Sequence, residues 1–139
     1  MERIIPTGKK IRRREFGFTM VELMIVMAII VILVSIAIPQ YQKALIRAKE
    51  SVLKNNLFTL RQVIDEYTYD KQKAPQSLDD LVSAGYLREI PIDPITGRNE
   101  WKTVMEDALQ SVNQTEPGLF DVKSESDKSG LDGTPYADW

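Results

Sequence analysis

Hydrophobic residues are concentrated in one long run near the beginning of the chain. From Leu23 to Ile38 the only residue that is not apolar is Ser35, and counted from Phe18 the run is 21 residues long. A helix needs about 20 apolar residues to cross the roughly 30 Å of hydrocarbon in a bilayer. The length and composition of this run therefore predict a membrane-spanning helix.

A second apolar pattern follows Pro39 and has the three- and four-residue spacing of a helix. Its members are Tyr41, Leu45, Ala48, Val52, Leu53, Leu57, Leu60, Ile64 and Tyr67. The two patterns together predict one helix from about Phe18 to about Tyr69. Proline lacks a backbone N–H, so we expect this helix to be interrupted or bent near Pro39. Its second half is expected to pack on a small domain.

The remaining half of the chain predicts a short helix and a few strands. Ser77 and Asp80 have the spacing of a capping box, with aspartate in place of the usual Glu or Gln, and Gly85 would close the helix. Residues 101–105 and 118–123 have the composition of strands. Two or three antiparallel strands packed against the long helix would give an α+β fold.

Two connecting segments differ in character. Residues 86–97 contain two prolines and a glycine, so they predict a loop with fixed turns, in which Asp93 and Pro94 set the turns rather than bind a ligand. Residues 106–117 are polar and irregular, and no element is predicted there.

Charge and composition narrow the function. The first 17 residues carry six basic and two acidic side chains, a charge of +4, so the rest must carry -6 to give the net charge of -2. An acidic body argues against nucleic-acid binding, and the basic start predicts that this end stays cytoplasmic while the body is translocated. The chain has no cysteine and no histidine. Disulfides, His-dependent triads and His-based zinc sites are therefore excluded, and we predict no enzymatic activity.

The apolar run has two simpler explanations, a plain membrane anchor and a secretory signal peptide. A secretory signal has a shorter core followed by a small-x-small cleavage site. Here a long run leads into Pro39 and a charged amphipathic pattern, which disfavours the secretory signal.

Glu22 is unusual because it lies near the start of the apolar run. A carboxylate in the apolar layer is costly, and such residues are usually paired and functional. One reading places Glu22 in the headgroup zone, where it simply reaches water. The other requires a cation at the same depth, and cleavage of the chain before Phe18 would create one as a new amino terminus.

The stretch RRREFGFTMVE resembles the class III signal of type IV pilins and pseudopilins. The resemblance implies that a prepilin peptidase cuts after Gly17 and N-methylates Phe18. Glu22 would then be the fifth mature residue and would meet the amino terminus of a neighbouring subunit during assembly. Met20 departs from the family, in which leucine is commoner. Pilin-like subunits can also stretch at the proline that corresponds to Pro39.

The order of predicted elements and the YLxxIPxDPxTG loop resemble the major pseudopilin of type II secretion systems. The resemblance implies a pilin-like fold with a leader at 1–17, a transmembrane and assembly helix at 18–40 and a periplasmic globular domain at 41–139. It implies a structural subunit of a pseudopilus that grows from the inner membrane to drive protein secretion. The implied partners are other copies of the chain, minor pseudopilins, the peptidase, an inner-membrane platform and an assembly ATPase. The alternative is a type IV pilin for adhesion, motility or DNA uptake.

The C-terminal stretch is rich in acidic and hydroxyl side chains, which are oxygen donors of the kind that calcium binds. On chemistry alone, a solvated acidic tail is favoured, because no EF-hand spacing is present. The resemblance to major pseudopilins implies one structural Ca²⁺, with Asp127, Asp132 and Ser124 as ligands. Lys128 stands where the family has glycine, and the loop is shorter than usual. Trp139 is expected to pack against this loop.

Overall fold

The computed structural model describes residues 17–106 and 117–139, which belong to two compact units. The first unit ends at Pro39 and the second extends from Gln40 to Trp139. The basic residues of the predicted leader and most of the segment 106–117 lie outside the described residues.

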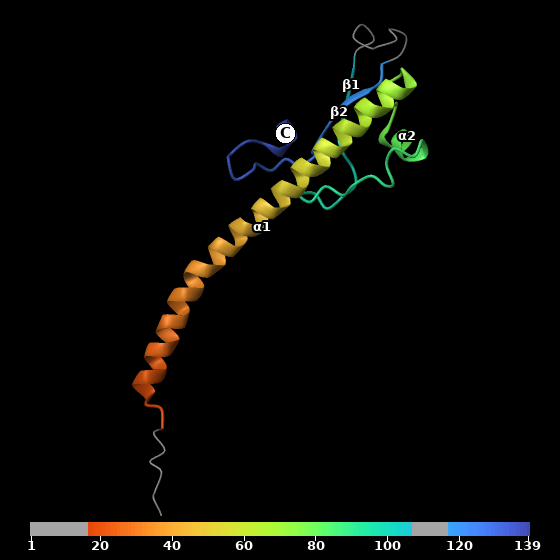
Figure 1. The fold of residues 1–139 in the computed structure, drawn as a ribbon. Coiled ribbons are helices and arrows are strands. Elements are labelled where there is room, and N and C mark those ends of the chain that lie inside the picture. Colours follow the sequence, from red (N-terminus) through yellow and green to blue (C-terminus); the bar gives the residue numbers. More distant parts are fainter. Residues whose placement is uncertain (1–16, 107–116) are drawn as a thin grey trace, which may run out of the picture. The chain divides into compact units, whose positions relative to one another are not determined.

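Helix α1 extends from Met20 to Lys71 (Figure 1). This confirms the prediction of one long helix, with ends that differ by two residues from the expected ones. Pro39 lies inside α1, and the helix is not interrupted there. Of the two expected effects, an interruption or a bend, the interruption is excluded, because the loss of a single backbone hydrogen bond does not end a helix of 52 residues. The bend stays a prediction.

The part of α1 in the second unit forms the centre of a small hydrophobic core. Its buried residues are Leu53, Leu57, Leu60, Val63 and Ile64. They pack with Leu78, Leu81, Trp101, Leu119, Val122 and Tyr136. The predicted apolar stripe is only partly buried, however, because its first four residues, Tyr41, Leu45, Ala48 and Val52, are exposed. The rest of the unit covers α1 only from about Glu50 onward.

Helix α2, Leu78–Ser83, begins and ends as its sequence predicts. The Asp80 carboxylate accepts hydrogen bonds from the backbone N–H groups of Ser77 at 3.0 Å and Gln76 at 2.8 Å. Gly85 follows the helix with a φ of +84°, a left-handed conformation that glycine adopts without steric cost. Leu78 and Leu81 face the core.

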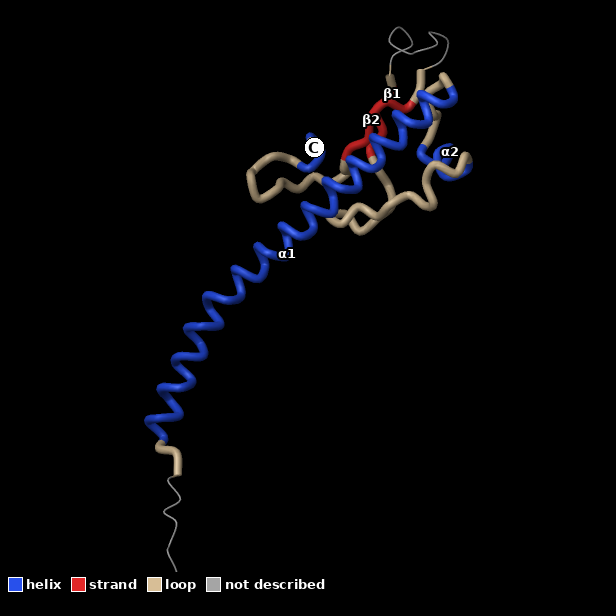
Figure 2. The backbone as a smooth tube through the Cα atoms, in the orientation of Figure 1, coloured by secondary structure: helices blue, strands red, loops and turns tan. Residues whose placement is uncertain are grey.

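The sheet has two antiparallel strands, β1 at Lys102–Met105 and β2 at Leu119–Lys123 (Figure 2). Both strands were predicted, although β1 begins one residue later than expected, and Trp101 lies buried just before it while Met105 is 45% exposed. Exposed and buried residues do not alternate along β1, because Thr103 is exposed as well, and the pairing with β2 shifts between Val104 and Met105. A short 3₁₀ helix, η1 at Tyr136–Asp138, lies at the end of the chain. The fold is thus a long helix packed on a small antiparallel sheet, as expected for a pilin-like α+β protein.

Candidate functional site

The predicted cleavage position lies directly before α1. Residues 17–19 have no regular secondary structure, and the Phe18 side chain is 81% exposed. A side chain added at Gly17 would meet no atom within 4 Å. The fold of this chain therefore does not require glycine at position 17, and the 17–18 peptide bond lies outside the helix.

Glu22 lies in the first turn of α1, next to a cap that sequence reasoning did not identify. The Thr19 side chain accepts a hydrogen bond from the Glu22 backbone N–H at 3.2 Å, and the Thr19 carbonyl accepts one from Leu23. The signal was present as a T-x-x-E spacing, which is typical of helix starts. A carboxylate is also favoured near the positive N-terminal end of a helix. Within residues 17–106 and 117–139, no basic side chain forms an ion pair with Glu22.

The first part of α1 presents an apolar surface on all sides. In the described residues α1 is the one helix that is long and apolar enough to cross a membrane, and the other described residues do not bury its most apolar stretch. The Ser35 hydroxyl donates to the Val31 carbonyl at 2.7 Å, so its hydrogen-bonding capacity is met within the helix. This surface suits lipid or the apolar surface of another protein.

Pro39 lies at the boundary of the two units and inside α1. Because proline has no N–H, the Ser35 carbonyl four residues earlier lacks its usual partner in the helix. The predicted role of Pro39 in assembly stays a prediction.

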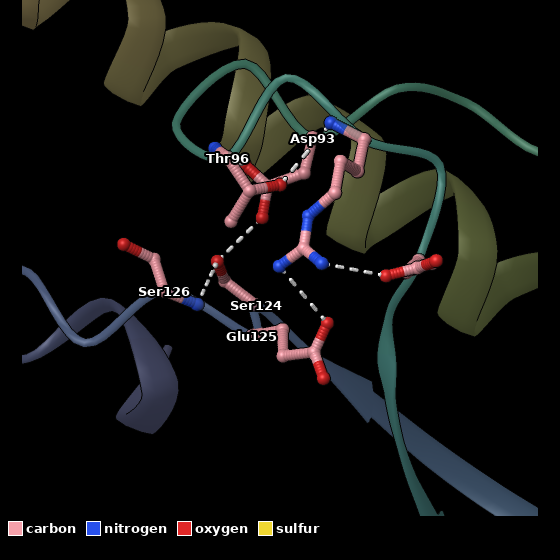
Figure 3. A network of polar contacts seen from close by, with 7 residues as sticks. Asp93, Thr96, Ser124, Glu125 and Ser126 are labelled. Atoms are coloured by element: carbon pink, nitrogen blue, oxygen red, sulfur yellow. Dashed lines mark hydrogen bonds and ion pairs between the residues drawn. The ribbon is translucent and has the colours of Figure 1, made fainter.

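Ser124, one of the three predicted calcium ligands, is buried and bound to a different partner (Figure 3). Its hydroxyl donates to the carboxylate of Asp93, and the same oxygen accepts the Ser126 backbone N–H at 3.2 Å. Asp93 is fully buried, and its other oxygen accepts the Ile95 N–H at 2.7 Å. Asp93 therefore sets the turn in the proline-containing loop, as predicted, and also joins that loop to the segment after β2.

The two predicted aspartate ligands are exposed. Asp132 accepts hydrogen bonds on one carboxylate oxygen from the Thr134 hydroxyl at 2.7 Å and the Thr134 N–H at 2.9 Å. These two bonds, the hydroxyl first, lower the pKa of Asp132. Asp127 makes no such contact in the part of the chain that the structure describes.

Carboxylate and hydroxyl oxygens suit calcium, which takes six to eight oxygen ligands. Among the described residues, however, no three His, Cys, Asp or Glu side chains gather where they could hold a metal ion. Two of the three predicted ligands also use their side-chain oxygens in hydrogen bonds within the protein, Ser124 with Asp93 and Asp132 with Thr134. In this arrangement the three residues do not fit a calcium site, although calcium binding itself stays a prediction.

The C-terminal segment, defined here as residues 128–139, contacts α1 through residues that sequence reasoning did not identify. Glu50 accepts the Leu131 N–H at 2.8 Å and the Tyr136 hydroxyl at 3.0 Å. Burial, and then the hydrogen bond to Glu50, raise the pKa of Tyr136. Arg61 donates to the Trp139 backbone oxygen at 2.8 Å. These contacts join residues 78 to 86 positions apart, so no local pattern could have predicted them.

Comparison with known proteins connects the N-terminal unit with a defined motif. Residues 12–38 match the model of the prokaryotic N-terminal methylation motif. The match extends from Arg12 through the whole apolar run and includes Gly17, Phe18 and Glu22.

Several curated proteins are similar to longer parts of the chain. The type II secretion system core protein G of Pseudomonas aeruginosa is 31% identical over 99 residues, which cover 60% of this chain and 70% of that protein. The core protein G of Klebsiella michiganensis is 27% identical over 143 residues, which cover 91% of each chain. The type IV major fimbrial protein FimA of Dichelobacter nodosus is 45% identical over 60 residues, 43% of this chain and 38% of that protein. No solved structure gives a significant match.

Proposed function

Because this chain belongs to the family of type II secretion system core protein G, we propose that it is the pseudopilin that polymerises from the inner membrane into a periplasmic pseudopilus during protein secretion. The observation that carries the proposal is the extent of the similarity. The match to the Klebsiella protein spans so much of the chain that it includes both units. The matches to type IV pilins cover only 34–38% of those proteins, against 70% or more for core protein G of Pseudomonas and of Klebsiella michiganensis, which makes a type IV pilin the weaker alternative.

The first step of this function is processing of the leader, residues 1–17. A prepilin peptidase would cleave after Gly17 and methylate the new amino terminus on Phe18. The match to the N-terminal methylation motif supports this step. The position of the 17–18 bond outside the helix also supports it, because a protease needs access to an extended peptide.

Residues 18–40 would anchor the processed chain in the inner membrane, and residues 41–139 would form the periplasmic domain. The exposed apolar surface of α1 supports the anchor. Assembly then requires other copies of the chain, and we propose minor pseudopilins, a platform protein and an ATPase as further partners. The role is structural, and no step of it requires catalysis by this chain.

Glu22 would pair with the methylated amino terminus of a neighbouring subunit. A charged side chain costs about 3 kcal/mol at the centre of a membrane helix and less toward its ends, where Glu22 lies, and pairing with an opposite charge offsets that cost. The structure supports this because Glu22 forms no ion pair within the described part of its own chain.

The processing step is tested by co-expressing the chain with a prepilin peptidase and measuring the intact mass. We expect a product that begins at Phe18 and carries one methyl group. Gly17→Leu should leave the full-length precursor in the membrane, although the fold itself tolerates a side chain there. A Gly17→Leu chain that is still cut at the same bond would contradict the cleavage assignment.

The assembly step is tested with Glu22→Ala in a reconstituted secretion system. We expect normal processing but few filaments and little secreted protein. Ser35→Ala is the matched control, since it also changes a polar side chain in the apolar run but removes only a hydrogen bond within the helix. Filaments of normal length from the Glu22→Ala chain would refute the pairing. Normal secretion in a strain that lacks this chain would favour the pilin alternative.

A further inference from the structure

The C-terminal segment is closed by its own backbone hydrogen bonds. The Gly130 N–H donates to the Thr134 carbonyl at 2.8 Å, and the Tyr136 N–H donates to the Lys128 carbonyl at 3.0 Å. Gly133 lies in the turn with a φ of +85°, which favours glycine. The loop therefore has a defined conformation that its own residues maintain.

Side chains within the segment complete this closure. The Trp139 indole N–H donates to the Thr134 hydroxyl at 2.7 Å, and that hydroxyl in turn donates to Asp132. The rings of Tyr136 and Trp139 meet edge to face, with centroids 5.0 Å apart. The expected packing of Trp139 on the loop is thus confirmed. The carboxylate of Asp132 is held by the loop itself, in the position where a metal ligand was predicted.

Three charged side chains of α1 then hold the closed loop against the helix. Glu50 accepts two hydrogen bonds from the loop, the Lys54 ammonium lies 4.4 Å from the centre of the Trp139 ring, and Arg61 donates to the Trp139 backbone. Positions 50, 54 and 61 fall on one face of a helix with 3.6 residues per turn. Bonds to charged groups are stronger than neutral ones, and a cation over an indole face is attractive.

Arg61 also connects this attachment to the sheet. Its Nε donates to Asp121 at 2.6 Å. Its Nη2, which also donates to Trp139, donates to the Val122 carbonyl at 3.2 Å. Asp121 and Val122 belong to β2, so one guanidinium joins α1, the sheet and the end of the chain. This is the kind of multidentate contact for which arginine is suited.

We propose that Glu50, Lys54 and Arg61 hold the C-terminal segment on α1, and that this attachment does not require a metal ion. The attachment fixes the position of the C-terminal segment, which is the role that was expected of the calcium ion. Ser124 and Asp132 take no part in the attachment, and their side-chain oxygens form hydrogen bonds with Asp93 and Thr134 rather than with a cation. The proposal concerns the stability of the subunit and holds whether or not the chain assembles into a pseudopilus.

The test is hydrogen exchange of residues 128–139, measured by mass spectrometry on the full chain in detergent micelles, with added Ca²⁺ and with a chelator. We expect the same slow exchange in both conditions. Glu50→Ala should speed exchange in this segment by about tenfold or more, because two bonds to a charged acceptor are lost. Glu50→Gln keeps an acceptor oxygen and should show a smaller increase. Glu66→Ala, at an exposed position on the same helix, is the matched control and should leave the segment unchanged.

Two results would overturn the proposal. One is slow exchange that needs Ca²⁺ and is lost in the chelator, which would show that a metal holds the segment. The other is a Glu50→Ala chain that exchanges like the control. If Glu50→Ala prevents folding, Lys54→Ala decides the matter, since it removes only the cation over Trp139 and leaves both other anchors. That variant should speed exchange of the segment in a folded protein, and unchanged exchange would count against the attachment.

Discussion

Replacement of Asp93 is expected to destabilise the globular unit far more than replacement of any exposed carboxylate. Asp93 is fully buried, and it accepts hydrogen bonds from the Ser124 hydroxyl (Figure 3) and from the backbone N–H groups of Ile95 and Thr96. Asp93→Ala removes the acceptor of all three donors at once. In Asp93→Asn, the amide oxygen can still accept the hydrogen bond from the Ile95 N–H. The amide NH2 group would lie beside Ser124 and could donate to its hydroxyl oxygen.

The magnitude follows from the number of donors left without a partner. The bond to Thr96 is long, at 3.4 Å, so only two bonds contribute substantially. Each buried donor without a partner costs about 1–3 kcal/mol, and the removal of a buried charge offsets part of that cost. We expect Asp93→Ala to lower the free energy of unfolding by about 2–4 kcal/mol, or the Tm by roughly 10–20 °C. Asp93→Asn should cost about half as much.

The assay is urea unfolding of the full chain in detergent micelles, followed by tryptophan fluorescence. Both tryptophans belong to the globular unit, and the Trp101 indole donates to the Pro91 carbonyl at 2.9 Å, close to the loop under test. A double-mutant cycle with Ser124→Ala measures the link directly, and we expect a coupling of about 1–2 kcal/mol. Additive effects of the two substitutions, or an Asp93→Ala chain as stable as the wild type, would refute the argument.

Two further predictions concern the core and the response to pH. Leu60 is fully buried on α1, so Leu60→Ala should lower the free energy of unfolding by about 2–5 kcal/mol. Phe58→Ala, at a position 66% exposed, should lower it much less. Equal urea unfolding midpoints for the two variants would count against the described core. Tyr136, which faces Glu50 and Asp132, has a raised pKa, so its contribution to stability is fully present below its unfolded pKa of about 10 and is lost as the pH rises through the higher folded value. Tyr136→Phe should therefore flatten the loss of stability in alkali, and an unchanged slope between the two proteins would exclude this contribution.

The parts of the fold that were predicted correctly depend on residues close together in the sequence. The spacing of apolar residues predicted α1, and the Ser77–Asp80 pair predicted the start of α2. Apart from the Thr19 cap, which has a local signal, the parts that were missed depend on distant contacts. Asp93 was correctly assigned to a turn, but its bond to Ser124, 31 residues later, has no local signal. The same holds for the attachment of the C-terminal segment to Glu50.

The apolar stripe of α1 shows that periodicity does not predict which of its residues are buried. Periodicity identifies which residues share a face of a helix, but it does not say what covers that face. Tyr41 and Val52 follow the same spacing as Leu57 and Leu60, yet the first pair is exposed and the second is buried. The difference arises because the described residues after α1 pack on the helix at Leu57 and Leu60 and leave its face open at Tyr41 and Val52.

In the proposed assembly, the apolar part of α1 exchanges lipid for the helices of other subunits. Lipid tails are as apolar as the side chains of another helix, so this exchange gains little from the hydrophobic effect. The step therefore depends on packing and on groups that lipid leaves unsatisfied. Between Met20 and Ile38 the only ionisable side chain is Glu22. Its unpaired carboxylate destabilises the subunit in the bilayer. In the filament that we propose, the carboxylate pairs with the amino terminus of the neighbouring subunit. Both effects favour the filament. Glu22→Ala would then anchor the subunit more firmly in the bilayer, in addition to weakening its contact in the filament.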